Sequence, residues 1–391
     1  MSKPARTFVE TLIEGALDGV VCTLPENILC ITGYWPSTGD SLLFCPTEGE
    51  PCLIIPSVDR AFVTDTEKLE VREYHIEQED ILFANTRTKV LSLLKGLFAD
   101  RGSARNRIGV ERSFETVAGS FRGSEANTPG EPFFKGLEEY NPEVVWVDAS
   151  SLLKNWRQIK TPRQLDAIKR CHSIAAHAFA NGRALIRPGA REIEIASAIE
   201  SSFQEFGVGH KGVRRARGFA FAMSGPVNAA NAWLPANFST DRRLEKGDLV
   251  LIEFNGYADG YWSDLSRTYV VGEPDQRQRQ LEASMKEILN SVIAEIKPGA
   301  KGKFLDRKAR SLMKEHSLEA FFPHYIGHGV GLAFHESPIL SEGFEATVEA
   351  GMILAIEPGI YIPDFGGIRF EQNVAVTPTD VQILSDFDTG L

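Results

Sequence analysis

The chain lacks the features that mark secreted, membrane-spanning and nucleic-acid-binding proteins. Its 391 residues include five cysteines, an odd number without CxxC spacing, so a disulfide framework or a structural zinc site is not expected. No apolar run approaches the roughly 18 residues that span a bilayer. The N-terminal stretch MSKPARTFVETLIEG has neither the apolar core nor the cleavage site of a secretory signal. The formal net charge of −11 disfavours nucleic acid and anionic membrane surfaces as partners, and we predict a cytoplasmic protein.

The length allows two or three domains, and the composition changes once along the chain. Short apolar runs such as GVVCTL, SLLFCP and PCLIIP alternate with a helical pattern, which predicts an α/β domain over residues 1–156. A new helix is predicted after Trp156, because Thr161 is a good N-cap and Pro162 fits the first helical position. We therefore expect a second domain over residues 157–391.

The second part contains an internal repeat. The segments LIRPGAREIEIASAIE and EIKPGAKGKFLDRKARSLM each read as a helix end, a Pro-Gly-Ala turn at Pro188 or Pro298, and another helix. Further on, KGDLVLIEF and AGMILAIEP each place a glutamate, Glu253 or Glu357, six residues after a glycine. This pattern indicates a duplicated α+β unit.

The stretch LVLIEFNGYADGYWSDLSRTYVV, residues 249–271, reads as a β-hairpin with a carboxylate in each arm. If Ala258-Asp259 is the loop, Glu253 lies directly opposite Asp264. If Asp259-Gly260 is the loop, which turn chemistry favours, the two are diagonal neighbours on one face. Like charges facing one another in a sheet are unfavourable, and burial makes them more so unless a proton, an arginine or a metal intervenes.

Two more carboxylates and a group of histidines have similar surroundings. Glu357 in ILAIEPGIY and Glu371 in GGIRFEQNVAV lie in apolar strand contexts, and PHYIGHGVGLAFHESP carries His324, His328 and His335 between glycines. Independent solvent-facing carboxylates and structural histidines are the alternative interpretation. Imidazole combined with carboxylates suits manganese, iron, cobalt or zinc, so the set predicts a metal site.

These segments together resemble the pita-bread metallopeptidase family, which includes aminopeptidase P, prolidase, methionine aminopeptidase and the metal-free creatinase. The resemblance covers nearly the whole chain and rests on GDLVLIEFNGYADGYWSDLSRTYVVG, GHGVGLAFHESP, AIEPGIYIP and GGIRFEQNVAVT, with WRQIKTPRQLDAIK at the domain entry. It implies an α+β fold, a duplicated pita-bread catalytic domain preceded by a creatinase-type α/β N-terminal domain.

The resemblance also implies site residues. The family's metal ligands fall on Glu253, Asp264, His328, Glu357 and Glu371, and its substrate-binding residues on His335, Arg369 and Tyr361. Two positions depart from the family pattern. Glu253 stands where the family has aspartate, and Ala236 stands where it has a further histidine.

The chemistry implied is hydrolysis of Xaa-Pro bonds, in dipeptides or at peptide N-termini, by a homodimer. Two divalent ions, Mn2+ before Co2+, Zn2+ or Fe2+, would be bridged by Asp264 and Glu371 and would activate a water. Glu357 would act as general base and acid, and His335 would stabilise the oxyanion. The carboxylate of Glu253 reaches about 1.5 Å further than that of aspartate, whereas ligand positions tolerate about 0.2 Å. Either the backbone shifts, or the second ion is weakly held, or no metal binds.

Three functions follow from this pattern. The first is a metal-dependent Xaa-Pro peptidase. The second is a metal-independent, creatinase-like hydrolase of a small C–N substrate, with Glu253 or Glu357 as base or nucleophile. The third is a non-catalytic binding protein on this fold. His210 is a possible substitute for the missing histidine, whereas His172 and His177 lie on an amphipathic helix and are interpreted as structural.

Overall fold

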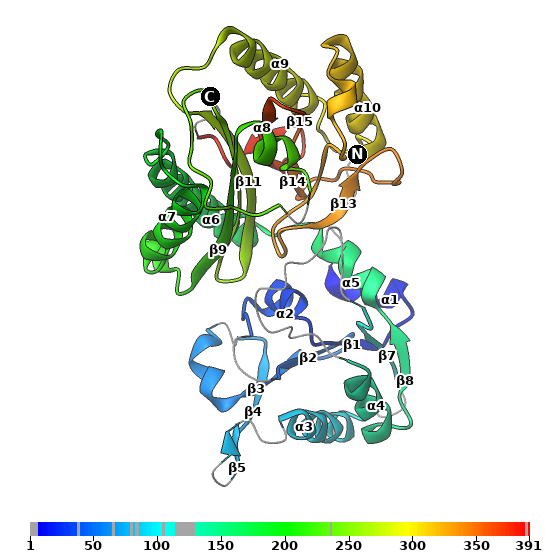
Figure 1. Cartoon of the computed structure of the whole chain (residues 1–391). Coiled ribbons are helices and arrows are strands. Elements are labelled where there is room, and N and C mark those ends of the chain that lie inside the picture. Colours follow the sequence, from blue (N-terminus) through cyan, green and yellow to red (C-terminus); the bar gives the residue numbers. More distant parts are fainter. Residues whose placement is uncertain are drawn as a thin grey trace. The chain divides into compact units, whose positions relative to one another are not determined.

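The computed structural model describes residues 7–36, 40–64, 67–78, 81–82, 86–103, 106–113, 130–234, 237–387 and 390–391. These residues form two compact units, which meet in the sequence between Arg157 and Gln158 (Figure 1). Ala236, where the family's further histidine is missing, lies outside the described residues. Among the described helices, none has both the length and the hydropathy that crossing a bilayer requires.

The N-terminal unit is a mixed sheet covered by helices on both faces (Figure 1). Val20 packs with one helical layer and Val21 with the other, because successive side chains of a strand point to opposite faces. This arrangement confirms the α/β prediction. The sheet order is β4-β3-β2-β1-β7-β8, with β1 (Gly19–Cys22), β2 (Leu42–Pro46), β3 (Cys52–Pro56), β4 (Glu70–Tyr74), β7 (Arg107–Val110) and β8 (Val145–Asp148). One layer contains α1 (Phe8–Glu14), α2 (Pro25–Thr32) and α5 (Ser150–Arg157), the other α3 (Thr86–Asp100) and α4 (Glu131–Tyr140); η1 (Ser57–Phe62), β5 (Glu77–Gln78) and β6 (Ile81–Leu82) complete the unit.

The second unit begins with a helix whose start follows from its sequence. Helix α6 (Pro162–Arg183) has Pro162 in its first turn, and the Thr161 hydroxyl accepts a hydrogen bond from the Gln164 amide. The Gln164 side chain accepts one from the Thr161 amide in return, which completes a capping box. The predicted helix start is therefore confirmed.

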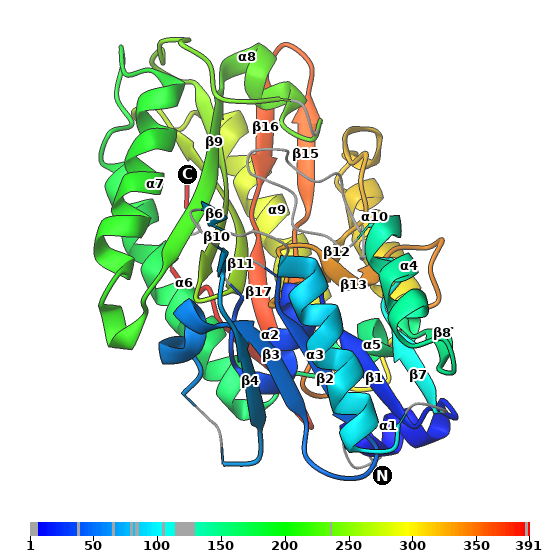
Figure 2. The same cartoon turned by 90° about the horizontal axis from the view of Figure 1, so that it is seen from below.

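The first half of this unit packs two helices on an antiparallel sheet of order β11-β10-β9. Its apolar core lies between α6, α7 and that sheet, as Figure 2 shows. The elements after α6 are α7 (Glu192–Gly207), η2 (His210–Gly212), β9 (Ala216–Ser224), α8 (Gly225–Asn228), η3 (Ala229–Asn231), β10 (Leu249–Ala258) and β11 (Tyr261–Val270).

The second half packs two more helices on a sheet of order β13-β12-β14-β17-β18 and a ribbon of β15 and β16. Strand β17 runs beside β11 (Figure 2). The Asn373 side chain joins the two strands by bonding both the amide and the carbonyl of Asp264. The elements are α9 (Gln276–Ile293), α10 (Gly302–Glu315), η4 (Glu319–Phe321), β12 (Gly327–Gly329), β13 (Glu336–Leu340), β14 (Ile353–Ile356), β15 (Gly359–Ile362), β16 (Gly366–Arg369), β17 (Gln372–Val376) and β18 (Val381–Ile383).

The two halves repeat one another down to individual backbone hydrogen bonds. In the first Pro-Gly-Ala turn, the Gly189 amide donates to the Leu244 carbonyl at 2.8 Å. In the second, Gly299 donates to Val348, also at 2.8 Å. Both glycines have positive φ, 85° and 93°. A further bond recurs from Gly247 to Val271 and from Gly351 to Val376. The duplicated α+β unit is thereby confirmed.

The β10–β11 hairpin turns at Asp259-Gly260, whose φ angles of 49° and 85° fit a type I′ turn. Glu253 pairs with Ser266 and Asn255 with Asp264, so the two predicted ligands are diagonal neighbours. The register favoured by turn chemistry is confirmed, and the alternative with Glu253 directly opposite Asp264 is wrong.

Candidate metal centre

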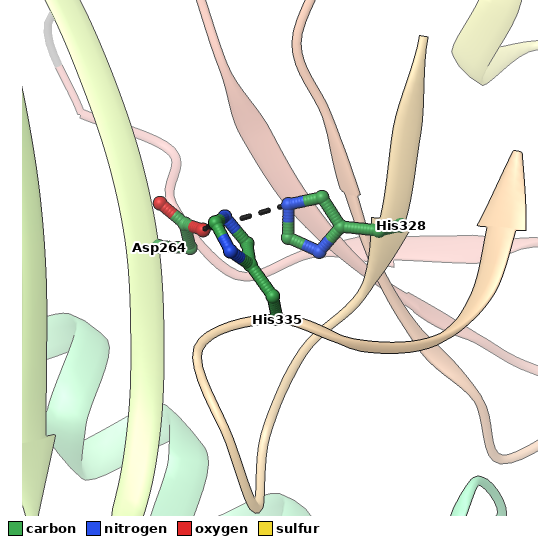
Figure 3. Close-up of side chains that lie close together, drawn as sticks. All are labelled: Asp264, His328 and His335. Atoms are coloured by element: carbon green, nitrogen blue, oxygen red, sulfur yellow. Dashed lines mark ion pairs between the residues drawn. The ribbon is translucent and has the colours of Figure 1, made fainter. Parts of the chain in front are cut away.

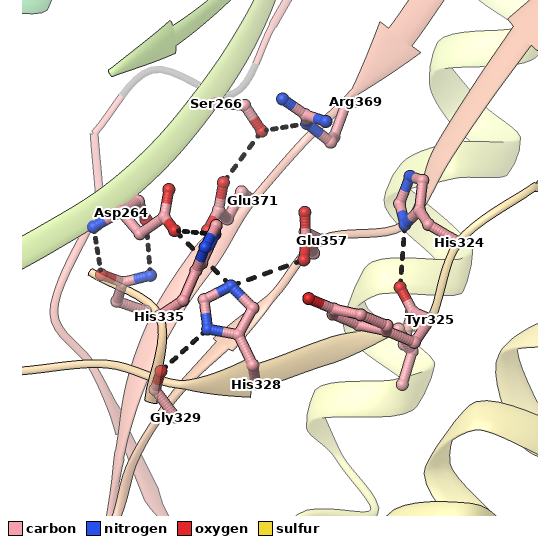
Figure 4. A network of polar contacts seen from close by, with 12 residues as sticks. Asp264, Ser266, His324, Tyr325, His328, Gly329, His335, Glu357, Arg369 and Glu371 are labelled. Carbon is pink, nitrogen blue, oxygen red and sulfur yellow. Dashed lines mark hydrogen bonds and ion pairs between the residues drawn. The ribbon is translucent and has the colours of Figure 1, made fainter. Parts of the chain in front are cut away.

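The side chains predicted for the site lie together where the two halves of the second unit meet. Figure 4 shows six of them, Asp264, His328, His335, Glu357, Arg369 and Glu371. They converge from strands and strand ends that are far apart in the sequence. Glu253 comes from β10, Asp264 from β11, His328 from β12, His335 from the loop before β13, Glu357 from the end of β14, Tyr361 from β15, Arg369 from β16 and Glu371 from the residue before β17.

One face of the β9–β10–β11 sheet carries both carboxylates and aromatic rings. Phe221 of β9 pairs with Glu253, and Phe219 pairs with Asn255, which in turn pairs with Asp264. Paired residues of neighbouring strands present their side chains on the same face. The carboxylates on β10 and β11 are therefore flanked by rings on β9.

His328 is oriented as a ligand toward two carboxylates. Its Nδ1 lies 2.8 Å from the Gly329 carbonyl, which can only accept, so Nδ1 carries the proton. Its Nε2 then presents a lone pair, 3.5 Å from Asp264 Oδ2 and 3.6 Å from Glu357 Oε1 (Figure 4). A backbone bond that fixes the tautomer in this way is usual for metal-binding histidines.

His335 approaches the same carboxylate from the other side. Its Nε2 lies 3.0 Å from Asp264 Oδ2, and its ring stands nearly perpendicular to that of His328, at 88° (Figure 3). Two groups of possible ligand atoms share Asp264, and within each group all atoms lie within 4.8 Å of one another. The groups are Asp264, His328 and His335, and Glu253, Asp264 and Glu371.

Several buried atoms of this cluster have no hydrogen-bond partner among the described residues. They include Asp264 Oδ2, His328 Nε2 and Glu371 Oε1. Buried polar atoms are normally satisfied, so convergent orphans of this kind need an explanation. A divalent cation supplies one, because oxygen and imidazole nitrogen are the ligands that such ions take. The residues present therefore fit a metal ion.

Charge repulsion in the cluster agrees with that fit. Burial, and then the charges of Glu371 and Glu253, raise the pKa of Asp264 well above its usual range. Burial and the charge of Glu253 do the same for the pKa of Glu371. Burial raises the pKa of Glu357 to about 8, with a contribution from Glu253. A cation among these carboxylates would relieve the repulsion.

Burial acts on the imidazoles in the opposite direction. It lowers the pKa of His328 to about 3, with His335 contributing. It lowers the pKa of His335 to about 4, with Arg369 contributing. Both rings are therefore neutral at pH 7, the form in which imidazole donates a lone pair.

Arg369 connects the outer part of the site. It is 7% exposed, and its Nη2 pairs with Glu253 Oε2. Its Nη1 donates to the Tyr361 hydroxyl at 3.0 Å and its Nε to the Ser266 hydroxyl at 2.9 Å. Ser266 donates in turn to Glu371 Oε2 at 3.0 Å (Figure 4). The guanidinium thus reaches two predicted ligands, one directly and one through Ser266.

Sequence reasoning missed Asn255 and Ser266. Asn255 is 2% exposed and donates from Nδ2 to Glu253 Oε1 at 2.9 Å. Both positions follow from period-two alternation in the hairpin, since Asn255 is two residues after Glu253 and Ser266 two after Asp264. That alternation was the available signal.

Sequence reasoning also missed a buried ion pair beside His335. Lys160 Nζ contacts Glu336 Oε1, and each side chain is 1% exposed. Glu336 Oε2 also accepts from the Leu332 amide at 3.3 Å. The pair anchors the loop that carries His335.

The other histidines serve elsewhere. His324 donates from Nδ1 to the Tyr325 carbonyl at 2.8 Å and bonds the Tyr361 hydroxyl through Nε2 at 3.0 Å, behind the carboxylates. His172 is buried and bonds the Asn373 side chain at 2.8 Å, so its ring lies outside the cluster of predicted ligands. His210 bonds the Ser173 hydroxyl at 2.9 Å instead of the carboxylates, so the expectation that it replaces the missing histidine is wrong.

A duplicated α+β unit with a carboxylate and imidazole centre between its halves, preceded by an α/β unit, defines a metal-dependent hydrolase of the pita-bread type. Comparison with known families identifies the family. The chain belongs to metallopeptidase family M24, whose model matches residues 166–378. The Creatinase/Prolidase N-terminal domain matches residues 6–159.

Individual relatives are similar over the whole length. The Xaa-Pro dipeptidase of Pyrococcus furiosus is 28% identical over 392 residues, covering 100% of both chains. The solved prolidase of Pyrococcus horikoshii OT3 has a TM-score of 0.78 at 25% identity and covers 98% of each chain. The X-Pro aminopeptidase of Thermotoga maritima MSB8, at 23% identity and a TM-score of 0.81, shares the fold over 98% of this chain and 99% of its own.

Proposed function

We propose that the chain hydrolyses Xaa-Pro peptide bonds with a bound divalent metal. The observation that carries the proposal is the convergence of unpartnered ligand atoms from Asp264, His328 and Glu371 at one point of the fold. Relatives named Xaa-Pro dipeptidase supply the substrate class. The creatinase-like and non-catalytic alternatives have no such named relative among these and leave the buried orphan atoms unexplained.

Asp264, His328, Glu357 and Glu371 would hold the metal. When bound, the ion would polarise the scissile carbonyl and make a water molecule more acidic. Glu357, at 14% side-chain exposure, borders the cluster and would take the proton of that water and pass it to the leaving nitrogen. His335 would donate a hydrogen bond to the oxyanion, and the Lys160–Glu336 pair would keep its loop in place.

Mn2+ is the ion to test first. The set of carboxylate oxygens with one imidazole is harder than the thiolate-rich sets that select zinc or copper(I). Co2+, Zn2+ and Fe2+ suit the same donors. The resemblance implies two ions. Whether a second ion binds depends on where the carboxylate of Glu253 lies.

The aromatic rings beside the carboxylates favour an apolar residue before the proline. The centroid of the Phe334 ring lies 4.5 Å from that of His335, 5.5 Å from that of Phe219 and 5.3 Å from that of Trp262. Phe221 adjoins Phe219 at 5.7 Å and is half-buried. A bulky apolar side chain on the substrate would bury area against these rings.

We further propose a cytoplasmic homodimer in which residues 157–391 carry the catalysis and residues 1–156 form an accessory domain. Support for the compartment is that all five cysteines are free, four of them buried. Support for the division of labour is that every proposed site residue comes from the second unit. Size-exclusion chromatography with light scattering tests the dimer.

Hydrolysis of Xaa-Pro dipeptides by metal-free protein, before and after addition of Mn2+, tests the proposal. We expect activity only with metal, on Leu-Pro but not on Leu-Ala. A matched control is Asp306→Asn, which alters a buried carboxylate that bonds Arg310 and the Ile326 amide instead of the cluster. Absence of hydrolysis with each of the four ions would contradict it.

A further inference from the structure

Both carboxylate oxygens of Glu253 are already held by the protein. Oε2 pairs with the Arg369 guanidinium, and Oε1 accepts from Asn255 Nδ2 at 2.9 Å. Glu371 Oε1 differs, because it has no hydrogen-bond partner among the described residues. Asp264 Oδ2 likewise lacks a hydrogen bond there and faces the imidazoles of His335 at 3.0 Å and His328 at 3.5 Å. Asp264, His328 and Glu371 thus keep ligand atoms open to an ion, whereas Glu253 is committed to a cation and an amide donor.

The backbone around Glu253 is regular and contains no β-bulge. Strand β10 keeps an unbroken antiparallel register with β11 from Leu249 to Ala258, and with β9 from Val250 to Ala258. In contrast, the β12–β13 ladder changes register next to His328. The additional methylene therefore extends the carboxylate by about 1.5 Å from the strand, and its Oε2 contacts Arg369.

A second ion would depend on Glu253. The two carboxylates that could bridge, Asp264 and Glu371, offer it shared oxygens, and Glu253 is the further ligand in that group. A ligand displaced by much more than about 0.2 Å does not complete a coordination shell.

We propose that this chain holds a single tightly bound metal ion at Asp264, His328, Glu357 and Glu371, and that Glu253 is the fixed charge partner of Arg369 instead of a metal ligand. This inference rests on the proposed function for the presence of metal. It replaces the pair of ions that the resemblance implies, because the residue that departs from the family pattern is the one whose two oxygens already bond Arg369 and Asn255.

A metal count on the full chain tests it. The protein is stripped with chelator, loaded with excess Mn2+, dialysed, and measured by inductively coupled plasma mass spectrometry. We expect about one ion per chain. Electron paramagnetic resonance of the same sample should show isolated Mn2+, since ions about 3.5–4 Å apart in a two-metal site couple. About two ions per chain with a coupled spectrum would overturn the inference.

Two substitutions at the same position provide the comparison. Glu253→Asp shortens the side chain to the family's ligand and should raise the count to about two, with a coupled spectrum. Glu253→Gln keeps the length and removes the charge, and should leave the count at about one. A drop in the Mn2+ count of Glu253→Gln relative to the unsubstituted protein would show that Glu253 is a ligand and overturn the inference. If neither variant folds, as judged by circular dichroism, the count on the unsubstituted protein still decides.

The same samples separate this inference from the proposed function. One ion with Leu-Pro hydrolysis supports both. Two ions with hydrolysis overturn the inference and leave the function standing. One ion without hydrolysis supports the inference and overturns the function, and absence of binding overturns both.

Discussion

Two buried carboxylate sites of the second unit differ in how their oxygens are satisfied. Glu192, at the start of α7, is 0% exposed, and its oxygens accept from the amides and hydroxyls of Ser224 and Thr240 at 2.6–2.9 Å. Asp264 and Glu371 are 2% and 1% exposed, yet each keeps one oxygen without a partner among the described residues.

The difference separates a carboxylate whose acceptors are all occupied from one that keeps an acceptor open to a ligand. Burial alone does not distinguish them, since Glu192 is at least as buried as the others. Saturation with donors makes Glu192 a cross-link between α7, the end of β9 and the segment at residue 240. The unsatisfied oxygens of Asp264 and Glu371 instead raise the free energy of the metal-free fold, and a bound cation or a proton lowers it again.

The largest expected effect follows from removing the charge of Asp264, one of the two carboxylates that keep an oxygen without a partner. Asp264→Asn should lower kcat/KM for Leu-Pro about 1,000-fold or more, because the outer partners of a ligand alone are worth about 10–100-fold. The metal content should fall with it. The metal-free variant should melt at the same temperature as the parent or higher, because one buried like charge is gone. Steady-state kinetics measure kcat/KM, mass spectrometry measures the metal content, and circular dichroism measures the melting temperature. Activity within tenfold of the parent would argue against a ligand role for Asp264.

The reverse outcome, a loss of stability without a loss of metal, is expected for the fully hydrogen-bonded Glu192. Glu192→Ala leaves the Ser224 and Thr240 donors unpaired and should destabilise the second unit by on the order of 4 kcal/mol. Urea unfolding measures the loss. The metal count of the folded variant should stay unchanged, and Glu192→Gln, which keeps the shape and half of the acceptors, should lose less. Loss of metal at unchanged stability would erase the distinction between the two sites.

Glu111 in the N-terminal unit is intermediate in how its oxygens are hydrogen-bonded. Its Oε1 accepts from the Thr23 and Leu24 amides at 2.6 and 2.8 Å, while its Oε2 has no partner among the described residues. Burial, opposed in part by these bonds, raises its pKa from 4.5 to about 7. The folded state therefore holds a proton on Glu111 where the unfolded chain does not.

The sign of the pH effect follows from that direction. The stability contributed by the raised pKa of Glu111 is complete below pH 4.5 and is lost as the pH rises through 7. Glu111→Gln imitates the protonated form and should exceed the parent's stability at pH 8 by on the order of 2–3 kcal/mol, with little gain at pH 4.5. Urea unfolding at the two pH values measures it. An equal difference at both values would show that the carboxyl does not titrate with folding.

The smallest expected effect concerns the rings beside the unsatisfied carboxylates. Phe221→Ala removes apolar area next to Glu253 and should raise KM for Leu-Pro and Phe-Pro about tenfold. KM for Gly-Pro should hardly change, since glycine has no side chain to bury. Phe304→Ala, at a 49% exposed position on α10, is the matched control. Equal effects on Gly-Pro and Phe-Pro would place the apolar subsite elsewhere.

Much of this arrangement could be predicted because its determinants are local in the chain. Asp259-Gly260 determines a type I′ turn, and the turn determines the register of ten residue pairs. The Thr161–Gln164 capping box and the two Pro-Gly-Ala turns act over a few residues in the same way. The spacing of Glu253, Asp264, Glu357 and Glu371 in apolar strands also marked them as a set.

The sequence by itself therefore determined the capped helix start, the hairpin register, the duplication and the carboxylates and histidines of the cluster. Only the tertiary structure decided that His324 bonds the Tyr361 hydroxyl while His328 faces the carboxylates of Asp264 and Glu357. The two histidines are four residues apart in the chain. Only the tertiary structure also paired Glu253 with Arg369, 116 residues away. Contacts between distant strands depend on how the two halves pack, and no local pattern encodes which of several nearby carboxylates a buried guanidinium will reach.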